Sequence, residues 1–237
     1  MRPLLPLCSG PLPLRSGLLP LLLRLSLLFC LGLLHGCGTP PPAPQLYHLR
    51  IEPPPEAQPK PPSESPPSAL QRTTAAAPAV TARPLVLQLM NPVRLPELLD
   101  HSELLLPQGQ AGLQALASHR WAEPLRDAVP RLLRHDLARV LGEAQVWSSP
   151  LPAGVVATRQ LRLEVLSLQA NAQRSAVELS ARYVLSHPLG STPAQTQTLH
   201  IQAASTGSTP DALVAAHRLA LWQLAQSLAR AVVQAGP

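Results

Sequence analysis

The chain has 237 residues, a formal net charge of +6 and 3% aromatic residues. Removal of residues 1–36, which contain three arginines and no acidic residue, leaves a net charge of +3. This weakly basic balance comes without a Lys/Arg-rich run and without aromatic platforms on which bases could stack. It gives no indication of a nucleic-acid-binding protein, so we expect no nucleic acid among the partners.

Residues 1–36 have the pattern of a secretory signal peptide. Residues 25–34 form a ten-residue apolar stretch directly after Arg24. Such a stretch is typical of the central region of a signal peptide and is too short for a transmembrane helix. The alternative is an uncleaved membrane anchor that contains a cysteine by chance. We favour cleavage, because the apolar run ends where a cysteine and a proline-rich segment begin.

Cys37 is the predicted lipidation site. Leu34 lies three residues before it and Gly36 directly before it, which resembles the lipobox of bacterial lipoproteins, although His35 departs from that pattern. The other two cysteines lie in the leader, so the mature chain would have one thiol and no internal disulfide. By resemblance to enterobacterial sorting, Gly38 in place of Asp predicts transfer to the outer membrane.

Residues 37–84 are predicted to hold the lipidated N-terminus, a first strand and a proline-rich tether. They contain 14 of the 30 prolines. Within residues 45–51, Leu49 and Ile51 alternate with polar residues, which predicts a strand. Residues 52–82 have almost no large apolar side chain whose burial could offset the entropy of ordering. We therefore predict that this segment is a disordered or polyproline-II-like loop.

A folded domain is predicted over residues 85–237, and it begins with short elements. The apolar patterns favour a buried strand, one helical turn, and two further strands around a tight turn. These elements are predicted at residues 85–90, 95–100, 103–106 and 113–117, with the turn at 107–109.

A first long helix is predicted from Glu123 and Pro124 to Gly142. Pro124 fits the first helical position, where its missing N–H costs nothing. Apolar residues recur at a period of 3.6 residues from there to the glycine, which ends the helix. Pro130 lies inside this pattern, so we expect a kink or a later helix start.

The C-terminal half predicts three strands and a second helix. Alternation over residues 161–165, 177–185 and 199–203 indicates strands with one covered face, as in an antiparallel sheet. A loop at residues 187–193 would join the last two strands as a hairpin. A helix is predicted from a Ser208/Thr209 cap to about Gln234. The predicted fold is α+β, an antiparallel sheet with two helices packed on one face.

The sequence contains no recognisable catalytic, metal-binding or cofactor-binding pattern. The motifs of a nucleophile elbow, a zinc protease, a C-x-x-C site and a glycine-rich phosphate loop are all missing. His135 and Asp136 are adjacent on a helix, so we expect them to face different directions. His217 lies on an apolar stripe, where a hydrogen-bonded structural histidine is favoured over a catalyst. We therefore predict a binding or structural module without a cofactor, rather than an enzyme.

The segment 119–125 (His-Arg-Trp-Ala-Glu-Pro-Leu), with Leu-Pro-Glu-Leu-Leu-Asp at 95–100 before it, resembles a known family. It is similar to the ABC-type transport auxiliary lipoproteins of the paraquat-inducible protein C type. The resemblance covers residues 37–50 and 85–235, and the Arg-Trp-Ala-Glu-Pro-Leu element is its most specific part. Leu98 stands where the family has an aromatic residue.

The resemblance implies a role in moving lipids or other hydrophobic molecules between the inner and outer membranes. The lipoprotein would sit on the periplasmic face of the outer membrane, anchored through Cys37. Its partners would be a periplasm-spanning MCE-type protein and the permease and ATPase of an ABC transporter. Whether the chain also forms a homo-oligomer stays open. The alternatives are a lipid-anchored periplasmic enzyme and an assembly factor for another envelope machine.

Four residues of the family-like segment are candidates for an interface: Arg120, Trp121, Glu123 and Pro124. An aromatic side chain with charged neighbours resembles an interface hot spot. An aromatic residue before a helix start also commonly packs under the first helical turn. A structural role for Trp121 is therefore the favoured alternative.

Overall fold

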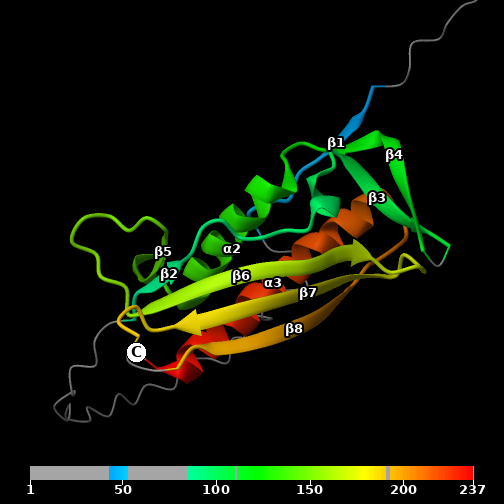
Figure 1. The fold of residues 1–237 in the computed structure, drawn as a ribbon. Coiled ribbons are helices and arrows are strands. Elements are labelled where there is room, and N and C mark those ends of the chain that lie inside the picture. Colours follow the sequence, from blue (N-terminus) through cyan, green and yellow to red (C-terminus); the bar gives the residue numbers. More distant parts are fainter. Residues whose placement is uncertain (1–42, 53–84, 110, 191–192, 237) are drawn as a thin grey trace, which may run out of the picture. The chain divides into compact units, whose positions relative to one another are not determined.

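The computed structural model describes residues 43–52, 85–109, 111–190 and 193–236 (Figure 1). The predicted signal peptide, the lipidation site Cys37 and most of the proline-rich tether lie outside the described residues. These predictions, and the domain boundaries that depend on them, therefore stay predictions.

Five strands form the main sheet. From one edge to the other they are β5 (Val146–Ser148), β2 (Leu87–Leu89), β6 (Arg159–Ala170), β7 (Ala176–Ser186) and β8 (Gln195–Ala204). The long strands β6, β7 and β8 pair antiparallel, whereas β2 runs parallel to both β5 and β6. In β7 every second side chain from Val177 to Leu185 is buried, because successive side chains of a strand point to opposite faces.

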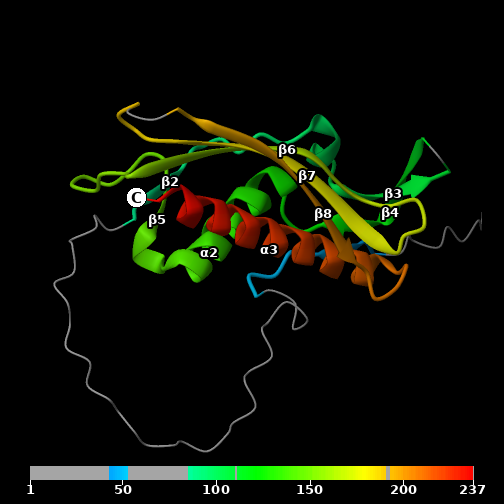
Figure 2. The ribbon, with the colours of Figure 1, turned by 90° about the horizontal axis from the view of Figure 1, so that it is seen from below.

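Two helices, α2 (Leu125–Leu141) and α3 (Pro210–Ala235), cover one face of this sheet (Figure 2). The Thr209 side chain accepts a hydrogen bond from the Ala212 backbone N–H, so it caps α3 as predicted. Pro124 occupies the cap position of α2 rather than its first helical position, one residue earlier than predicted. The helix runs through Pro130 without a shifted start and ends at Gly142, where φ is +115°.

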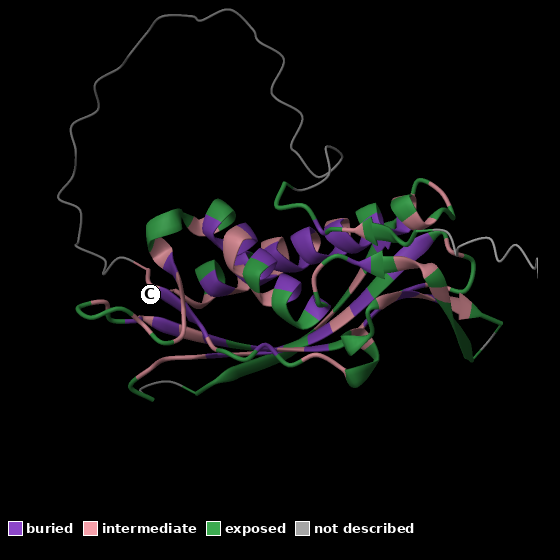
Figure 3. Cartoon of the chain, turned by 90° about the horizontal axis from the view of Figure 1, so that it is seen from above, coloured by how far each residue is buried: buried purple, intermediate pink, exposed green. Residues whose placement is uncertain are grey.

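The hydrophobic core lies between the helices and the sheet. Figure 3 shows buried residues on the facing sides of the two layers and exposed residues on their outer sides. Leucine supplies most of the large side chains that are fully buried, as expected from its abundance in this chain. The core contains fully buried leucines from both the sheet and the helices, including Leu87, Leu132, Leu161, Leu179 and Leu213.

A second, smaller sheet has the strand order β1 (Gln45–Tyr47), β4 (Gly112–Trp121) and β3 (Glu103–Gln108). β1 pairs parallel with the end of β4, and β3 and β4 form an antiparallel hairpin. Gly112 begins β4 where a Cβ atom would lie 2.6 Å from the carbonyl oxygen of Gln108, so the tight turn requires glycine there. Between β2 and β3, Glu97–Asp100 form the predicted helical turn, η2.

The α+β class and the two helices on one sheet face are confirmed. The main sheet is mixed rather than wholly antiparallel, because β2 and β5 join it in parallel. β5 and the η3 turn (Glu143–Gln145) before it were not predicted from the sequence. The first strand is shorter than predicted: it ends at Tyr47, beyond which Leu49 is buried outside any strand and Ile51 is exposed.

Candidate functional site

Trp121 lies at the junction of the small sheet and α2. Its backbone N–H donates to the carbonyl of Ser102 (2.8 Å), and the N–H of Ala122 donates to the carbonyl of Tyr47 (2.8 Å). The indole is only 9% exposed, and its ring meets that of His217 edge to face, with 5.7 Å between centroids. The side chain therefore packs in the core, between the end of β4 and α3.

His217 supports this contact as a neutral histidine. Its Nδ1 lies 2.7 Å from the carbonyl oxygen of Leu213, one helical turn earlier, so Nδ1 must donate the hydrogen bond. Burial lowers the pKa of His217, and the hydrogen bond to Leu213 only partly opposes that effect. The prediction of a hydrogen-bonded structural histidine is confirmed.

The other three candidate interface residues make different contacts from those of Trp121. Arg120 is exposed and lies 3.6 Å from Glu103, on the partner strand of the hairpin. Glu123 accepts two hydrogen bonds from Arg131 on α2. The carbonyl of Pro124 accepts from two backbone N–H groups of the first helical turn. The four residues are neighbours along the chain, but their interface role stays a prediction.

A buried ion pair joins the two helices. Arg218 of α3 donates from Nη1 to Asp136 Oδ2 (2.8 Å) and from Nη2 to Asp136 Oδ1 (2.7 Å). The Arg218 side chain is 3% exposed and the Asp136 side chain 0%. This bidentate geometry is the strongest arrangement for an arginine and a carboxylate. This pair was not predicted from the sequence.

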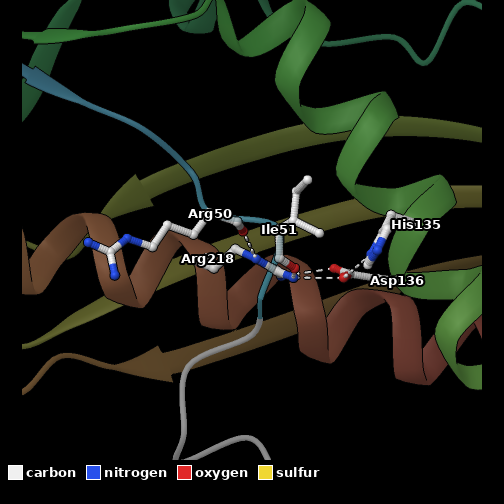
Figure 4. Close-up of polar contacts among 5 residues, drawn as sticks. All are labelled: Arg50, Ile51, His135, Asp136 and Arg218. Carbon is white, nitrogen blue, oxygen red and sulfur yellow. Dashed lines mark hydrogen bonds and ion pairs between the residues drawn. The ribbon is translucent and has the colours of Figure 1, made fainter.

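The same guanidinium also binds the chain that follows β1. Arg218 Nε donates to the carbonyl of Arg50 (2.6 Å), and Nη2 donates to the carbonyl of Ile51 (2.8 Å). Figure 4 shows the arginine between this segment and Asp136. We call Arg218, Asp136 and the two carbonyls the arginine clamp. It ties the described N-terminal segment to both helices.

The clamp sets the electrostatics of Asp136. Burial raises the pKa of the Asp136 carboxyl, and the hydrogen bonds and charge of Arg218 oppose that rise. His135 Nδ1 lies 3.9 Å from the carboxylate, so the expectation that these neighbours face different directions was wrong. That nitrogen is buried and makes no hydrogen bond with any described residue. His135 can therefore add a positive charge beside Asp136 only when it is protonated.

Two open depressions flank these features. One is apolar, lies over Trp121 and His217, and is rimmed by Leu98, Leu105 and Leu113. The other is a groove between α2 and the loop after β2, lined by Arg126, Arg131 and Arg134 together with proline and valine side chains. Neither brings a nucleophile and a base together.

Metal and membrane-spanning features are also missing from the part of the chain that the structure describes. No group of three or more histidine, cysteine or acidic side chains is placed there to hold a metal ion. None of the described helices combines the length and apolar character needed to cross a membrane. What the arrangement offers is surfaces for contact and a fixed N-terminal segment.

Comparison with solved structures shows the same fold in other proteins. One crystal structure, described as that of an uncharacterized protein, has a TM-score of 0.54 at 20% identity, over 64% of this chain and 95% of that one. A Xanthomonas campestris protein has a TM-score of 0.53 at 17% identity, over 67% of this chain and 90% of that one. At these identities the likeness concerns the fold alone. No curated protein matches the chain.

The model of one protein family, described as the ABC-type transport auxiliary lipoprotein component, matches residues 69–229. The match spans more than half of the chain, from before β2 into the last turns of α3, and it includes the segment around Trp121 and both ends of the buried ion pair. The chain therefore belongs to the ABC-type transport auxiliary lipoprotein family.

Proposed function

We propose that this protein is an outer-membrane lipoprotein, anchored through lipid on Cys37, that serves as the auxiliary component of an MCE/ABC-type intermembrane lipid transport system. Membership of the auxiliary lipoprotein family supports the transport role in general terms. Gly38, the residue after the predicted lipidated cysteine, favours the outer membrane over the inner one. The periplasmic face follows from the predicted signal peptide.

The arginine clamp is the observation that carries this proposal. A chain that is fixed to the fold close to its lipid anchor limits how far the domain can move from the membrane. Here β1 pairs with β4, and Arg218 holds the two carbonyls just beyond β1. Both attachments lie within 14 residues of Cys37. The domain would therefore stay beside the membrane, in reach of a partner that spans the periplasm.

The site favours binding over catalysis. The buried charged pair has all of its described contacts within the protein, and the depressions near it are open and lack a nucleophile–base pair. The partners we propose are a periplasm-spanning MCE-type protein and, through it, an ABC permease and ATPase. The proposed contact region is made of Arg120, Trp121, Glu123 and Pro124, although Trp121 is only 9% exposed.

Lipidation is tested with Cys37→Ala. The wild-type protein should incorporate radioactive palmitate and float with outer-membrane markers on a sucrose gradient. The variant should do neither, because no other cysteine remains after cleavage before residue 37. Label retained on the variant would refute lipidation at Cys37. Flotation of the wild type with inner-membrane markers would reverse the proposed location.

The transport role is tested by capture from detergent-solubilised membranes. We expect the wild-type lipoprotein to retain an MCE-type protein identified by mass spectrometry, with a permease and ATPase at lower yield. An exposed residue far from the proposed contact, Arg230 on α3, provides the control variant Arg230→Ala. Capture of peptidoglycan-synthesis or lipopolysaccharide-export proteins in place of the MCE-type protein would favour the assembly-factor alternative.

A further inference from the structure

The β3–β4 hairpin has an apolar outer face. Opposed residues of an antiparallel pair point to the same side, and the pairs Leu105–Ala115 and Pro107–Leu113 share one side. Ala117 continues that side along β4. Leu113 is 40% exposed, the two alanines are exposed, and Leu105 and Pro107 are half-buried. We call these five residues the hairpin face. A sheet face turned to water is normally polar, so its composition is unusual.

The hairpin is held on the domain by its other face. Leu104 and Leu106 point to that side and are each 2% exposed, because they enter the hydrophobic core. Arg174, in the turn between β6 and β7, donates to the carbonyl of Pro107 at 3.2 Å. The hairpin face is therefore displayed on a fixed support.

Charge is missing from the whole hairpin beyond its base. Residues 104–118 contain no acidic residue, no lysine, no arginine and no histidine. The ionic groups near the hairpin are Glu103 and Arg120, which lie 3.6 Å apart where the two strands leave the domain, and Arg174, whose guanidinium donates to the carbonyl of Pro107. The hairpin face itself would bring no charged side chain of its own into an apolar phase, and the desolvation of ions is the largest cost of such a contact.

The predicted anchor, Cys37, is joined to the domain through β1, at the same end as the hairpin. β1 and the hairpin lie together, at the end opposite the C-terminus (Figure 1). Because β1 is parallel to β4, the chain enters β1 from the side on which β4 begins, which is the side of the hairpin turn. Cys37 precedes Ala43, the first described residue, by six residues. Six extended residues span about 20 Å at most.

We propose that the hairpin face lies on the lipid surface and forms a second membrane contact beside the anchor. This inference rests on the lipidation of Cys37 proposed above. The few residues between Cys37 and Ala43 would keep this end of the domain close to the bilayer. There the hairpin presents an uncharged face with an exposed leucine. The contact would fix the orientation of the domain, so that the main sheet and helices extend away from the membrane.

The inference is tested with a fluorescent probe on the lipidated full-length protein. Leu113→Cys adds the only free thiol of the mature chain, and a polarity-sensitive dye is attached to it. Leu189→Cys is the matched control, since Leu189 is an 83% exposed leucine in the loop at the other end of β7. Both proteins are reconstituted into phosphatidylethanolamine/phosphatidylglycerol vesicles with and without spin-labelled lipid, and flotation is measured first.

We expect both proteins to float and only the probe at position 113 to shift to the blue and lose fluorescence to the spin-labelled lipid. If both float and neither probe is quenched, the hairpin inference is overturned while the lipid anchor stands. A blue shift at 113 that grows with protein density but is insensitive to the spin label means that another protein chain covers the face, which also overturns it. If neither protein floats, the anchor fails and the hairpin inference fails with it.

Discussion

Replacement of Arg218 by methionine tests whether the arginine clamp holds the N-terminal segment and the two helices together. Methionine fills a similar volume without a charge. The change leaves the Asp136 carboxylate, which is 0% exposed, without its partner, and it removes the donors to the carbonyls of Arg50 and Ile51. Removing one member of a buried ion pair costs about 3–5 kcal/mol. Each lost hydrogen bond to the charged group adds up to about 1.5–3 kcal/mol before the carbonyl regains water.

We therefore expect Arg218→Met to lower the free energy of unfolding by at least about 3 kcal/mol, a large part of the 5–15 kcal/mol typical of a domain. The loss should shrink at acidic pH. Without Arg218, burial acts on Asp136 against the weaker effect of His135 only, so the pKa of the carboxyl rises further. A carboxyl group whose pKa is higher in the folded protein than in the unfolded chain stabilises the fold when the pH lies below its unfolded pKa. This stabilisation is lost as the pH rises through its folded pKa. The difference between wild type and variant should thus be smaller at pH 5 than at pH 8.

The assay is urea unfolding of the mature chain with Cys37→Ala, followed by tryptophan fluorescence. Arg139→Met is the control, because Arg139 is exposed on α2 and should cost less than about 0.5 kcal/mol. Limited proteolysis adds a local readout, since the chain at Arg50 and Ile51 loses the donors to its carbonyls and should be cut more readily. A stability loss below about 1 kcal/mol with unchanged proteolysis would refute the reasoning, because a buried carboxylate cannot lose its partner so cheaply.

Two further predictions concern His217 and Trp121. Burial lowers the pKa of His217, so on acidification the histidine takes up a proton in the unfolded chain before it does so in the folded protein. The free energy of unfolding should therefore be highest above about pH 6.5 and should fall below that pH. The fall is at most about 1.4 kcal/mol per pH unit and ends at the folded pKa. Denaturation from pH 8 to pH 5 should show that fall, and His217→Gln should flatten it while the exposed His200→Gln does not. Trp121→Ala should lower the free energy of unfolding by about 3–5 kcal/mol in the same assay, because the indole is part of the hydrophobic core. Unchanged stability with lost capture of the MCE-type protein would show instead that Trp121 is an interface anchor.

Regular patterns predicted the long elements well, because local physics determines them. The alternation from Val177 to Leu185 predicted β7, since only one face of that strand is covered. Thr209 followed by Pro210 predicted the start of α3, because a side-chain cap and a preset φ are local properties. The position of Pro124 was wrong by one residue, which is the usual uncertainty at a helix end.

Features set by distant partners could not be predicted in the same way. β5 has three residues, too few to show a period, and it exists because Leu87–Leu89 pair with it in parallel from far away in the sequence. Arg218 lies between apolar residues of α3, and a charged residue in such a stripe is a signal that a buried partner exists. The sequence pattern does not identify that partner, because Asp136 lies 82 residues earlier on another helix.

The clamp and the small sheet together give the N-terminal segment two attachments of different kinds. β1 joins β4 by backbone pairing next to Trp121, and the chain beyond β1 is bound by Arg218 through its carbonyls. Trp121 contacts His217, and Arg218 is the next residue of α3, so both attachments meet the same turn of that helix. Arg218 thus links this N-terminal segment to α3 and, through Asp136, to α2. The most buried charged pair among the described side chains therefore stands where the chain from the proposed lipid anchor would enter the fold, although leucine and alanine fill most of the core and a buried ion pair is costly.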